Sequence, residues 1–221
     1  MTTINAKLVA LTQPTIGVGA GSAEGLVAYC AKVSNPANQD SPDYERLLAY
    51  CVRNKHWSVF EMANAVVEVE APRDITRQLL RHRSFSFQEF SQRYSDQIEF
   101  TDREYRRQDD KNRQNSTNDL DEDTQDVCNT ETYDYRRSVE IMYHWMRGQN
   151  VAKECARVIL PEGLTMSRLY VNGTLRSWIH YLDVRLDQST QLEHRILADK
   201  IREALLPAFP TVLGKLLDVE N

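Results

Sequence analysis

The feature that most constrains the fold is a change of hydrophobic period at Pro72. The preceding stretch, ANAVVEVEA, alternates between apolar and polar residues, which is the period of a half-buried strand. Its expected buried side consists of Ala65, Val67, Val69 and Ala71, and its polar side of Asn64, Glu68 and Glu70. In the following stretch, PRDITRQLLRHR, Ile75 and Leu79 are four residues apart, as on one side of a helix that Pro72 can start. The chain therefore combines strands with helices.

Similar patterns predict further elements. Strands are expected over residues 7–13 and 164–173, and extended chain over 84–100. Helices are expected over residues 22–34, 43–54, 133–149, 150–160 and 174–186 and within 189–210. Ser22 and Asn150 are the expected N-caps of two helices, and Thr190 with Glu193 forms an expected capping box. The helix that follows Pro72 is expected to end near His82.

Residues 102–132 are polar and charged, with almost no large aliphatic side chains. Such a composition supplies no apolar face, so a mobile polar loop is expected over this stretch. The charged residues between Arg103 and Arg113 are expected to face solvent. Elsewhere, His144, Trp145 and Trp178 lie within helical patterns and are expected in or near the core, whereas His194 is expected in an exposed turn.

The composition limits the possible functions. The net charge of −5 argues against a general nucleic-acid binder. No run of about 18 apolar residues occurs, so no membrane span is expected. The four cysteines are scattered and form no CxxC pair, so neither a disulfide framework nor a metal site is indicated. A reducing cytoplasm is the expected compartment.

A cluster of cations lies in the sequence QLLRHRSFSFQEFSQRYS. Gln78, Arg81 and His82 are spaced by three and four residues, so they share a polar side of the expected helix. Arg77, Arg81 and Arg83 offer rigid forks of N–H donors that suit phosphate or carboxylate. An anionic ligand would relieve their mutual repulsion. The alternative is a solvated helix end, where the helix dipole favours cations.

The stretch RHRSFSFQEFSQRY, in which seven residues separate Arg83 from Ser91, closely resembles the signature of the flavin-dependent thymidylate synthases. The segments HWSVFE (56–61), CARVILP (155–161) and LDVRLDQSTQLEHR (182–195) extend the resemblance in the family's order over most of the chain. The resemblance implies an α+β fold, with one catalytic domain over residues 1–221 and an antiparallel sheet packed with several long helices.

The resemblance also implies a reaction. Members of the family methylate deoxyuridine monophosphate (dUMP) to thymidylate (dTMP), with 5,10-methylenetetrahydrofolate as carbon donor. The hydride comes from FAD that NADPH has reduced, and no cysteine acts as a nucleophile. The resemblance further implies a homotetramer with active sites shared between subunits. We therefore expect dUMP, these cofactors and further copies of the chain as partners, and neither nucleic acid nor a membrane.

Site residues are carried over from the family at matching positions. The implied flavin contacts are Ser58, Arg81, His82, Arg83, Glu89, Thr174, Arg176 and His180. The implied nucleotide contacts are Gln78, Leu79, Leu80, Arg81, Glu89, Phe90, Ser91, Gln92, Arg93, Arg157 and Arg185. Arg185 matches the arginine that promotes ionisation of the uracil ring. Ser91 is expected to bind and polarise the nucleotide through its hydroxyl rather than attack it, because no histidine lies at an obvious spacing to activate it.

Two segments depart from the family pattern. The sequence VNGTLRSWIHY stands where many members have a VNARSLMNF-like segment. Counting back without gaps from Arg185 gives Thr174, Arg176 and His180 as the flavin contacts, whereas matching Asn172 to the family's asparagine would need a shift. The sequence DQSTQ stands where many members have DSHAQ, so Ser189 replaces a histidine.

Two other functions remain open from sequence. Phe85, Phe87, Phe90 and Tyr94 beside arginines would suit an RNA-binding module that stacks bases, although the acidic balance and the absence of an RNP motif count against it. The second alternative is a catalytically inactive relative of the family that still binds nucleotide or flavin.

Overall fold

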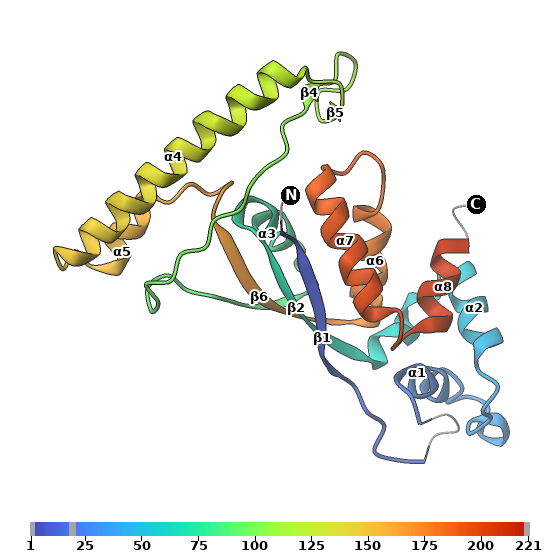
Figure 1. Cartoon of the computed structure of the whole chain (residues 1–221). Coiled ribbons are helices and arrows are strands. Elements are labelled where there is room, and N and C mark those ends of the chain that lie inside the picture. Colours follow the sequence, from blue (N-terminus) through green and yellow to red (C-terminus); the bar gives the residue numbers. More distant parts are fainter. Residues whose placement is uncertain (1–2, 18–20, 219–221) are drawn as a thin grey trace.

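The computed structural model describes residues 3–17 and 21–218, with side chains as far as Gly214. These residues form a four-stranded antiparallel sheet that packs with several helices (Figure 1). The strand order is β1 (Asn5–Leu11), β2 (Asn64–Pro72), β6 (Met166–Thr174) and β3 (Ser86–Glu89). A separate two-stranded hairpin pairs β4 (Arg107–Gln108) with β5 (Ser116–Thr117). The expected α+β fold with an antiparallel sheet is confirmed.

The two central strands carry the core. β2 and β6 pair along their whole length, from Asn64 opposite Thr174 to Pro72 opposite Met166. The four apolar residues that alternate along β2 are each at most 1% exposed, as the sequence predicts. They belong to one continuous hydrophobic core that also includes residues of the C-terminal helices, which agrees with a single domain.

The helices and 3₁₀ turns are α1 (Ala23–Ala31), η1 (Pro36–Asn38), α2 (Glu45–Arg53), η2 (Trp57–Met62), α3 (Arg73–Leu79), α4 (Glu122–Gly148), α5 (Lys153–Ala156), η3 (Arg157–Ile159), α6 (Leu175–Arg185), α7 (Leu192–Leu205) and α8 (Pro210–Asp218). Ser22 caps α1 as predicted, because its hydroxyl accepts a hydrogen bond from the N–H of Gly25. Trp178 of α6 is fully buried, also as predicted.

Helix α4 corrects the expectation of a loop over 102–132. The helix already begins at Glu122, where the carboxylate of Asp121 caps it by accepting from the N–H of Thr124. It extends away from the sheet (Figure 1), and in the described chain only Val139 and Tyr143 of this helix are buried. A helix without a covered face needs no apolar period, so its first three turns have the composition of a loop.

Exposure of α4 also overturns two expected core positions. Trp145 is 59% exposed and His144 is exposed as well. The apolar residues around them recur with the period of a helix. This period shows which residues share one side of the helix, but it does not show whether another element covers that side.

Three expected helix ends are wrong. Asn150 has a positive φ of 60° and lies before α5, whose N-cap is Ala152. The capping box at Thr190 does not form, because α7 begins at Leu192 and the Thr190 hydroxyl donates instead to the carbonyl of Val184. Helix α3 ends at Leu79, three residues before the expected end.

Gly173 marks a close approach on the sheet. The ring of Phe85 lies directly over this glycine of β6, and a Cβ atom at this position would collide with the ring. Phe85 in turn packs against Trp178, with ring centroids 4.4 Å apart. Because Gly173 has no side chain, Phe85 and the segment before β3 can pack closely against the core.

Within the part of the chain that the structure describes, no helix has both the length and the apolar character needed to cross a bilayer.

Candidate functional site

Several predicted nucleotide contacts meet around a cavity of about 240 Å³. The cavity lies where β3 and the residues after it meet β6, with α3 and η3 alongside. We call it the arginine pocket, and its lining residues are Arg73, Arg77, Glu89, Phe90, Ser91, Gln92, Arg157, Met166 and Ser167. The structure thus brings Arg157 beside residues 89–92, which lie more than sixty positions earlier in the sequence.

Three arginines make this pocket positive. Nη1 of Arg73 donates to Oε1 of Gln92 at 2.6 Å, while its buried Nε has no hydrogen-bond partner among the described residues. The guanidinium of Arg157 pairs with no described residue, and Arg77 forms an exposed ion pair with Glu162 at 2.7 Å. A buried donor without an acceptor is unfavourable, so the pocket favours an anionic oxygen ligand.

Hydroxyl and carboxyl groups also line the pocket. Oε1 of Glu89 accepts from the hydroxyl of Ser167 at 2.8 Å, between β3 and β6. Oγ of Ser91 accepts from the backbone N–H of Arg93 at 3.3 Å, which leaves its own proton free to donate to a ligand. No histidine or cysteine is among the described residues that line the pocket, so no histidine there can activate Ser91 as a nucleophile. The side chain of Arg93 points elsewhere, to Glu154 at 3.5 Å.

A second group of predicted residues meets where α3, α6 and α7 converge. Nε of Arg185, the last residue of α6, donates to Nε2 of His82 at 2.9 Å. The His82 ring also packs edge-on against Tyr181, with ring centroids 5.0 Å apart. No described residue accepts a bond from the terminal NH₂ groups of Arg185, so both remain available to a ligand.

The surroundings of Arg185 leave its charge uncompensated. Burial first, and the Arg185 guanidinium second, lower the pKa of His82 to about 4. His82 is therefore neutral at pH 7, and because its Nε2 accepts a bond, its proton lies on Nδ1. Arg185 is thus held in place by a neutral acceptor instead of by a carboxylate that would cancel its charge.

A third group contains predicted flavin contacts: Ser58 and the three residues found by counting back from Arg185. Its members, on η2 and the start of α6, are Ser58, Thr174, Arg176 and His180. Arg176 donates to Glu61 at 3.0 Å and to His180 at 3.5 Å, and the His180 ring contacts Trp57 with centroids 5.0 Å apart. Thr174 caps α6 through its hydroxyl, and Ser58 is exposed. Of the four, Arg176 and His180 are in direct contact.

The remaining predicted contacts surround α3. Arg81 and Arg83 are exposed, and their side chains pair with no described residue. The Leu79 side chain is fully buried in the core, so a ligand could meet it only through its backbone, whereas Leu80 packs against the core and is partly exposed. Gln78 faces α7 and does not line the arginine pocket.

The rings proposed for RNA stacking do not form a platform. Phe85 is 7% exposed and Phe87 packs against the core. Phe90 lines the arginine pocket, and Tyr94 is the one ring of the four that is largely exposed, at 83%. Consecutive bases need several accessible faces in a row, so the structure contradicts the RNA-binding reading.

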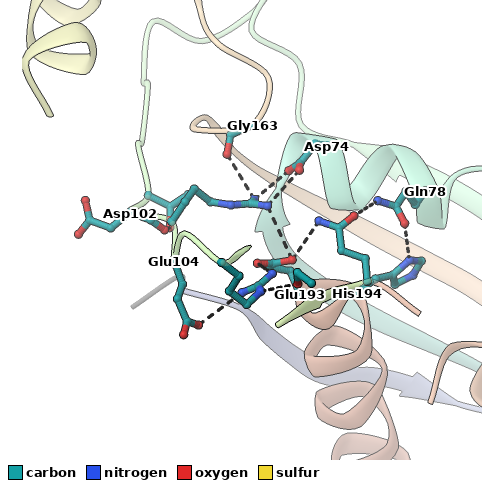
Figure 2. A network of polar contacts seen from close by, with 12 residues as sticks. Asp74, Gln78, Asp102, Glu104, Gly163, Glu193 and His194 are labelled. Carbon is teal, nitrogen blue, oxygen red and sulfur yellow. Dashed lines mark hydrogen bonds and ion pairs between the residues drawn. The ribbon is translucent and has the colours of Figure 1, made fainter. Parts of the chain in front are cut away.

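A network of charged and amide side chains joins residues 103–106 to α3 and α7 (Figure 2). Arg103 donates to both carboxylate oxygens of Asp74, at 3.0 and 3.2 Å, and Arg106 donates to Oε1 of Glu193 at 2.7 Å. The two arginine side chains are only 14% and 11% exposed, so the expectation of solvated charges is wrong for both. Burial opposes ionisation of Glu193, but its bonds from Arg106, the backbone and Gln191 outweigh this effect and hold its pKa below the usual value.

The same network continues through two amides to His194. Gln191 donates to Oε2 of Glu193 at 2.9 Å, Gln78 donates to Oε1 of Gln191 at 2.7 Å, and Nδ1 of His194 lies 3.1 Å from Oε1 of Gln78. His194 is fully buried rather than in an exposed turn. Burial, followed by the charges of Arg185 and His82, lowers its pKa to about 3.

Neither the larger cavity nor the cysteines coincide with the predicted contact residues. A cavity of about 640 Å³ lies between residues 103–106, α4 and the start of α7, but none of its described lining residues was predicted as a ligand contact. The cysteines also lie outside the arginine pocket: Cys51 is buried, Cys30 and Cys128 are half-buried, and Cys155 is exposed.

Sequence reasoning missed several residues that shape the site. Arg73 lies four positions before Arg77, and this spacing alone indicates a shared helix side. For Ser167, Glu193 and His194 no local signal distinguishes them from surface residues, because their partners come from distant segments.

Comparisons with known proteins place the chain in a family. The family described as "Thymidylate synthase complementing protein" matches residues 19–211. The chain is 47% identical to a flavin-dependent thymidylate synthase of Synechocystis sp. over 215 residues, which cover 96% of this chain and 99% of the relative. It is 45% identical to a probable flavin-dependent thymidylate synthase of Paramecium bursaria Chlorella virus 1 over 218 residues, which cover 97% of this chain and 99% of the relative.

Solved structures agree on the fold. The crystal structure of a UMP/dUMP methylase, PolB, from Streptomyces cacaoi bound with 5-Br dUMP has a TM-score of 0.79 to this chain. The match covers 98% of this chain and 96% of that one, at 24% sequence identity. With the RHR motif, the family match and the two near-full-length relatives, the chain belongs to the thymidylate synthase complementing proteins, the flavin-dependent thymidylate synthases.

Proposed function

We propose that this protein is a flavin-dependent thymidylate synthase that converts dUMP to dTMP by reductive methylation. The observation that carries the proposal is the 47% identity to an enzyme of that name over 96% of the chain. Two local features of the structure support it: a cationic pocket with unpaired donors, and an arginine whose charge is not neutralised.

The arginine pocket suits the phosphate of dUMP. Arg157 and the buried Nε of Arg73 are guanidinium donors without protein acceptors, and phosphate oxygens accept such bonds with good geometry. Ser91 donates its free hydroxyl proton, and Glu89, held by Ser167, accepts from an N–H or O–H of the nucleotide. The further proposed nucleotide contacts are Gln78, Leu79, Leu80, Arg81, Phe90, Gln92 and Arg93.

The surface at the start of α6 and around residues 81–83 suits FAD. Arg81 and Arg83 are exposed and unpaired among described residues, as a pyrophosphate site requires. The further proposed flavin contacts are Ser58, His82, Glu89, Thr174, Arg176 and His180. Bound FAD, once reduced by NADPH, supplies the hydride that completes the methyl group.

Arg185 activates the uracil ring. Its bond to His82 fixes the plane of the guanidinium, and both NH₂ groups remain for the base. A cation about 4 Å from the developing uracil anion stabilises it by roughly 4 kcal/mol at an effective dielectric near 20, or about three pKa units. Ionisation of the ring makes its carbon 5 nucleophilic without addition of a cysteine thiol. Ser91 binds and polarises the nucleotide in this mechanism.

The active site is shared between the subunits of a homotetramer. Helix α4 supports this assembly because several of its large apolar side chains are exposed: Val127, Tyr133, Tyr135, Ile141, Met142 and Trp145. Exposed apolar surface beyond scattered single residues often marks an interface. Further copies of the chain would cover α4 and bring the arginine pocket of one subunit to the Arg185 group of another.

Two co-substrates complete the reaction. 5,10-Methylenetetrahydrofolate donates the one-carbon unit and NADPH donates the electrons. Free cysteines agree with a reducing compartment, so we place the reaction in the cytoplasm.

The test is dTMP formation by the purified, FAD-loaded protein in a mixture of dUMP, methylenetetrahydrofolate and NADPH. We expect dTMP from the complete mixture and none when any one component is left out. Formation of dTMP by flavin-free protein without NADPH would contradict the flavin mechanism. A protein that binds FAD and dUMP but makes no dTMP would identify the inactive relative instead.

A further inference from the structure

Glu193 is the first member of a hydrogen-bonded chain that ends at a buried histidine (Figure 2). The chain runs from Glu193 through Gln191 and Gln78 to His194, with donor–acceptor distances of 2.9, 2.7 and 3.1 Å. It connects the start of α7 to α3, one turn before Arg81 and His82. Arg106 holds the other oxygen of Glu193 at 2.7 Å.

One carboxylate determines the direction of every bond in this chain. An ionised carboxylate can only accept, whereas an amide can turn either its oxygen or its nitrogen toward a neighbour. Because Glu193 accepts, Gln191 must present its nitrogen to Glu193 and therefore its oxygen to Gln78. Gln78 must then donate to Gln191, which turns its own oxygen toward His194.

The direction of the chain also determines the tautomer of His194. His194 faces an amide oxygen, so Nδ1 has to carry the proton. A neutral imidazole has one N–H, so Nε2 is a bare acceptor, and this atom is buried without a partner among the described residues. The hydroxyl of Tyr181 is likewise buried without a partner, and its ring lies between those of His194 and His82, at 5.8 and 5.0 Å between centroids.

We propose that Glu193 is a positioning residue for thymidylate synthesis, which directs the amide of Gln78 and the tautomer of His194 beside the Arg185–His82 pair. Glu193 acts through Gln191 and does not touch the substrate. The inference rests on the proposed function, in which Gln78 and Arg185 contact the nucleotide. Gln78 keeps one N–H and one oxygen lone pair for a ligand, and reversal of the chain would exchange their positions.

The test is the substitution Glu193→Gln in the full-length, FAD-loaded protein. An amide at 193 can present oxygen or nitrogen to Gln191, so the chain can run in both directions. Nitrogen-15 NMR of labelled histidines reads the His194 tautomer, with the signal assigned by its loss in His194→Gln. We expect the proton on Nδ1 in the parent protein and a population with the proton on Nε2 in Glu193→Gln. The KM for dUMP should rise about tenfold, the effect of one misdirected hydrogen bond, with kcat changed less than about twofold.

Two further variants separate direction from packing. Glu104→Gln is the matched control: it changes an exposed carboxylate beside Arg106 but keeps the carboxylate of Glu193 and its ion pair, so the tautomer should stay and the KM for dUMP should change less than about twofold. Gln191→Leu interrupts the chain but keeps the ion pair, so it should behave like Glu193→Gln. An unchanged His194 tautomer in Glu193→Gln, or the same change in Glu104→Gln, would overturn the proposal. A changed His194 tautomer in Glu193→Gln together with an unchanged KM for dUMP would also overturn it. Because the NMR measurement needs no turnover, a parent protein that makes no dTMP would count against the proposed function and not against the chain.

Discussion

At the level of single residues, the proposed chemistry depends on Arg185 remaining a full positive charge. A carboxylate at 2.9 Å would hold the guanidinium as well as His82 does, but it would cancel most of the field at the uracil ring. A neutral histidine orients the arginine and leaves its field intact. Burial therefore has a function here, because it lowers the pKa of His82 to about 4 and keeps the ring neutral.

Arg185→Ala should keep FAD bound and lower kcat by about 10²- to 10³-fold, because it removes a cation aimed at a charge that develops during the reaction. Turnover and the flavin absorbance spectrum of the purified variant test this together. The matched control is Arg195→Ala, since the side chain of Arg195 bonds only Gln188 among the described residues and should be dispensable. A kcat for Arg185→Ala within about twofold of the parent value would show that the role is misassigned.

The half-buried His82 and the buried His194 predict an acid-sensitive fold. His82 and His194 have folded-state pKa values lowered to about 4 and about 3, so below pH 6.5 the unfolded chain binds protons that the folded chain does not. Stability is full above pH 6.5 and is lost as the pH falls toward 4. For His194 alone, a folded pKa about 3.5 units below 6.5 gives a loss of roughly 2 kcal/mol at pH 5.

Urea unfolding between pH 7 and pH 5 measures this dependence. His194→Gln should flatten the fall in the free energy of unfolding, whereas His144→Gln, at an exposed position, should keep it. Equal slopes in the parent protein and in His194→Gln would contradict the assignment of a buried neutral histidine.

At the level of elements, the sequence predicts the strands better than the helix ends. The alternation along β2 and β6 is periodic over nine residues each, and burial of one side enforces it. Helix α4 was recognised only from residue 133 because its first turns face solvent and carry no apolar period. The local signals present were Asp121 as an N-cap and the acidic residues Glu122 and Asp123 in the first turn.

Gly173→Ala should destabilise the fold by about 1–3 kcal/mol, because the new methyl group would press on the ring of Phe85. The denaturant midpoint measures the effect. Gly163→Ala is the matched control, since no atom lies within 4 Å of a Cβ at that position, and it should change stability by less than about 0.5 kcal/mol. If both variants unfold at the same midpoint, the close approach of Phe85 to Gly173 does not limit the size of the residue at position 173.

At the level of the whole molecule, the candidate site could be predicted only in part. By resemblance, the RHR motif indicated His82 and Ser91, and the segment LDVRLDQSTQLEHR indicated Arg185. The structure places His82 and Arg185 in direct contact. The unpaired Nε of Arg73 and the chain from Glu193 to His194 arise from tertiary contacts between α3, α7 and distant segments. Local periodicity carries no information about such contacts, so these residues were missed.

The exposed apolar side chains of α4 predict how the proposed assembly should respond to charge. Ile141→Glu combined with Trp145→Glu should dissociate the oligomer and abolish dTMP formation while the circular dichroism of the fold remains, because two charges would be buried in the interface. Light scattering gives the mass. Val33→Glu, at a position that is 68% exposed and distant from α4 in sequence, should leave mass and activity unchanged. A double variant with the parent mass would exclude this part of α4 from the interface.

The central claim is that electrons from a bound flavin, and not a cysteine thiol, drive methylation of dUMP. A single-turnover experiment tests it most directly: anaerobic protein with fully reduced FAD is mixed with dUMP and methylenetetrahydrofolate in the absence of NADPH. Flavin absorbance and dTMP are measured over time. We predict that one flavin is oxidised for each dTMP formed, at the same rate, and that a variant with all four cysteines replaced by alanine does the same. Formation of dTMP while the flavin stays reduced, or loss of dTMP in the folded cysteine-free variant, would contradict the account.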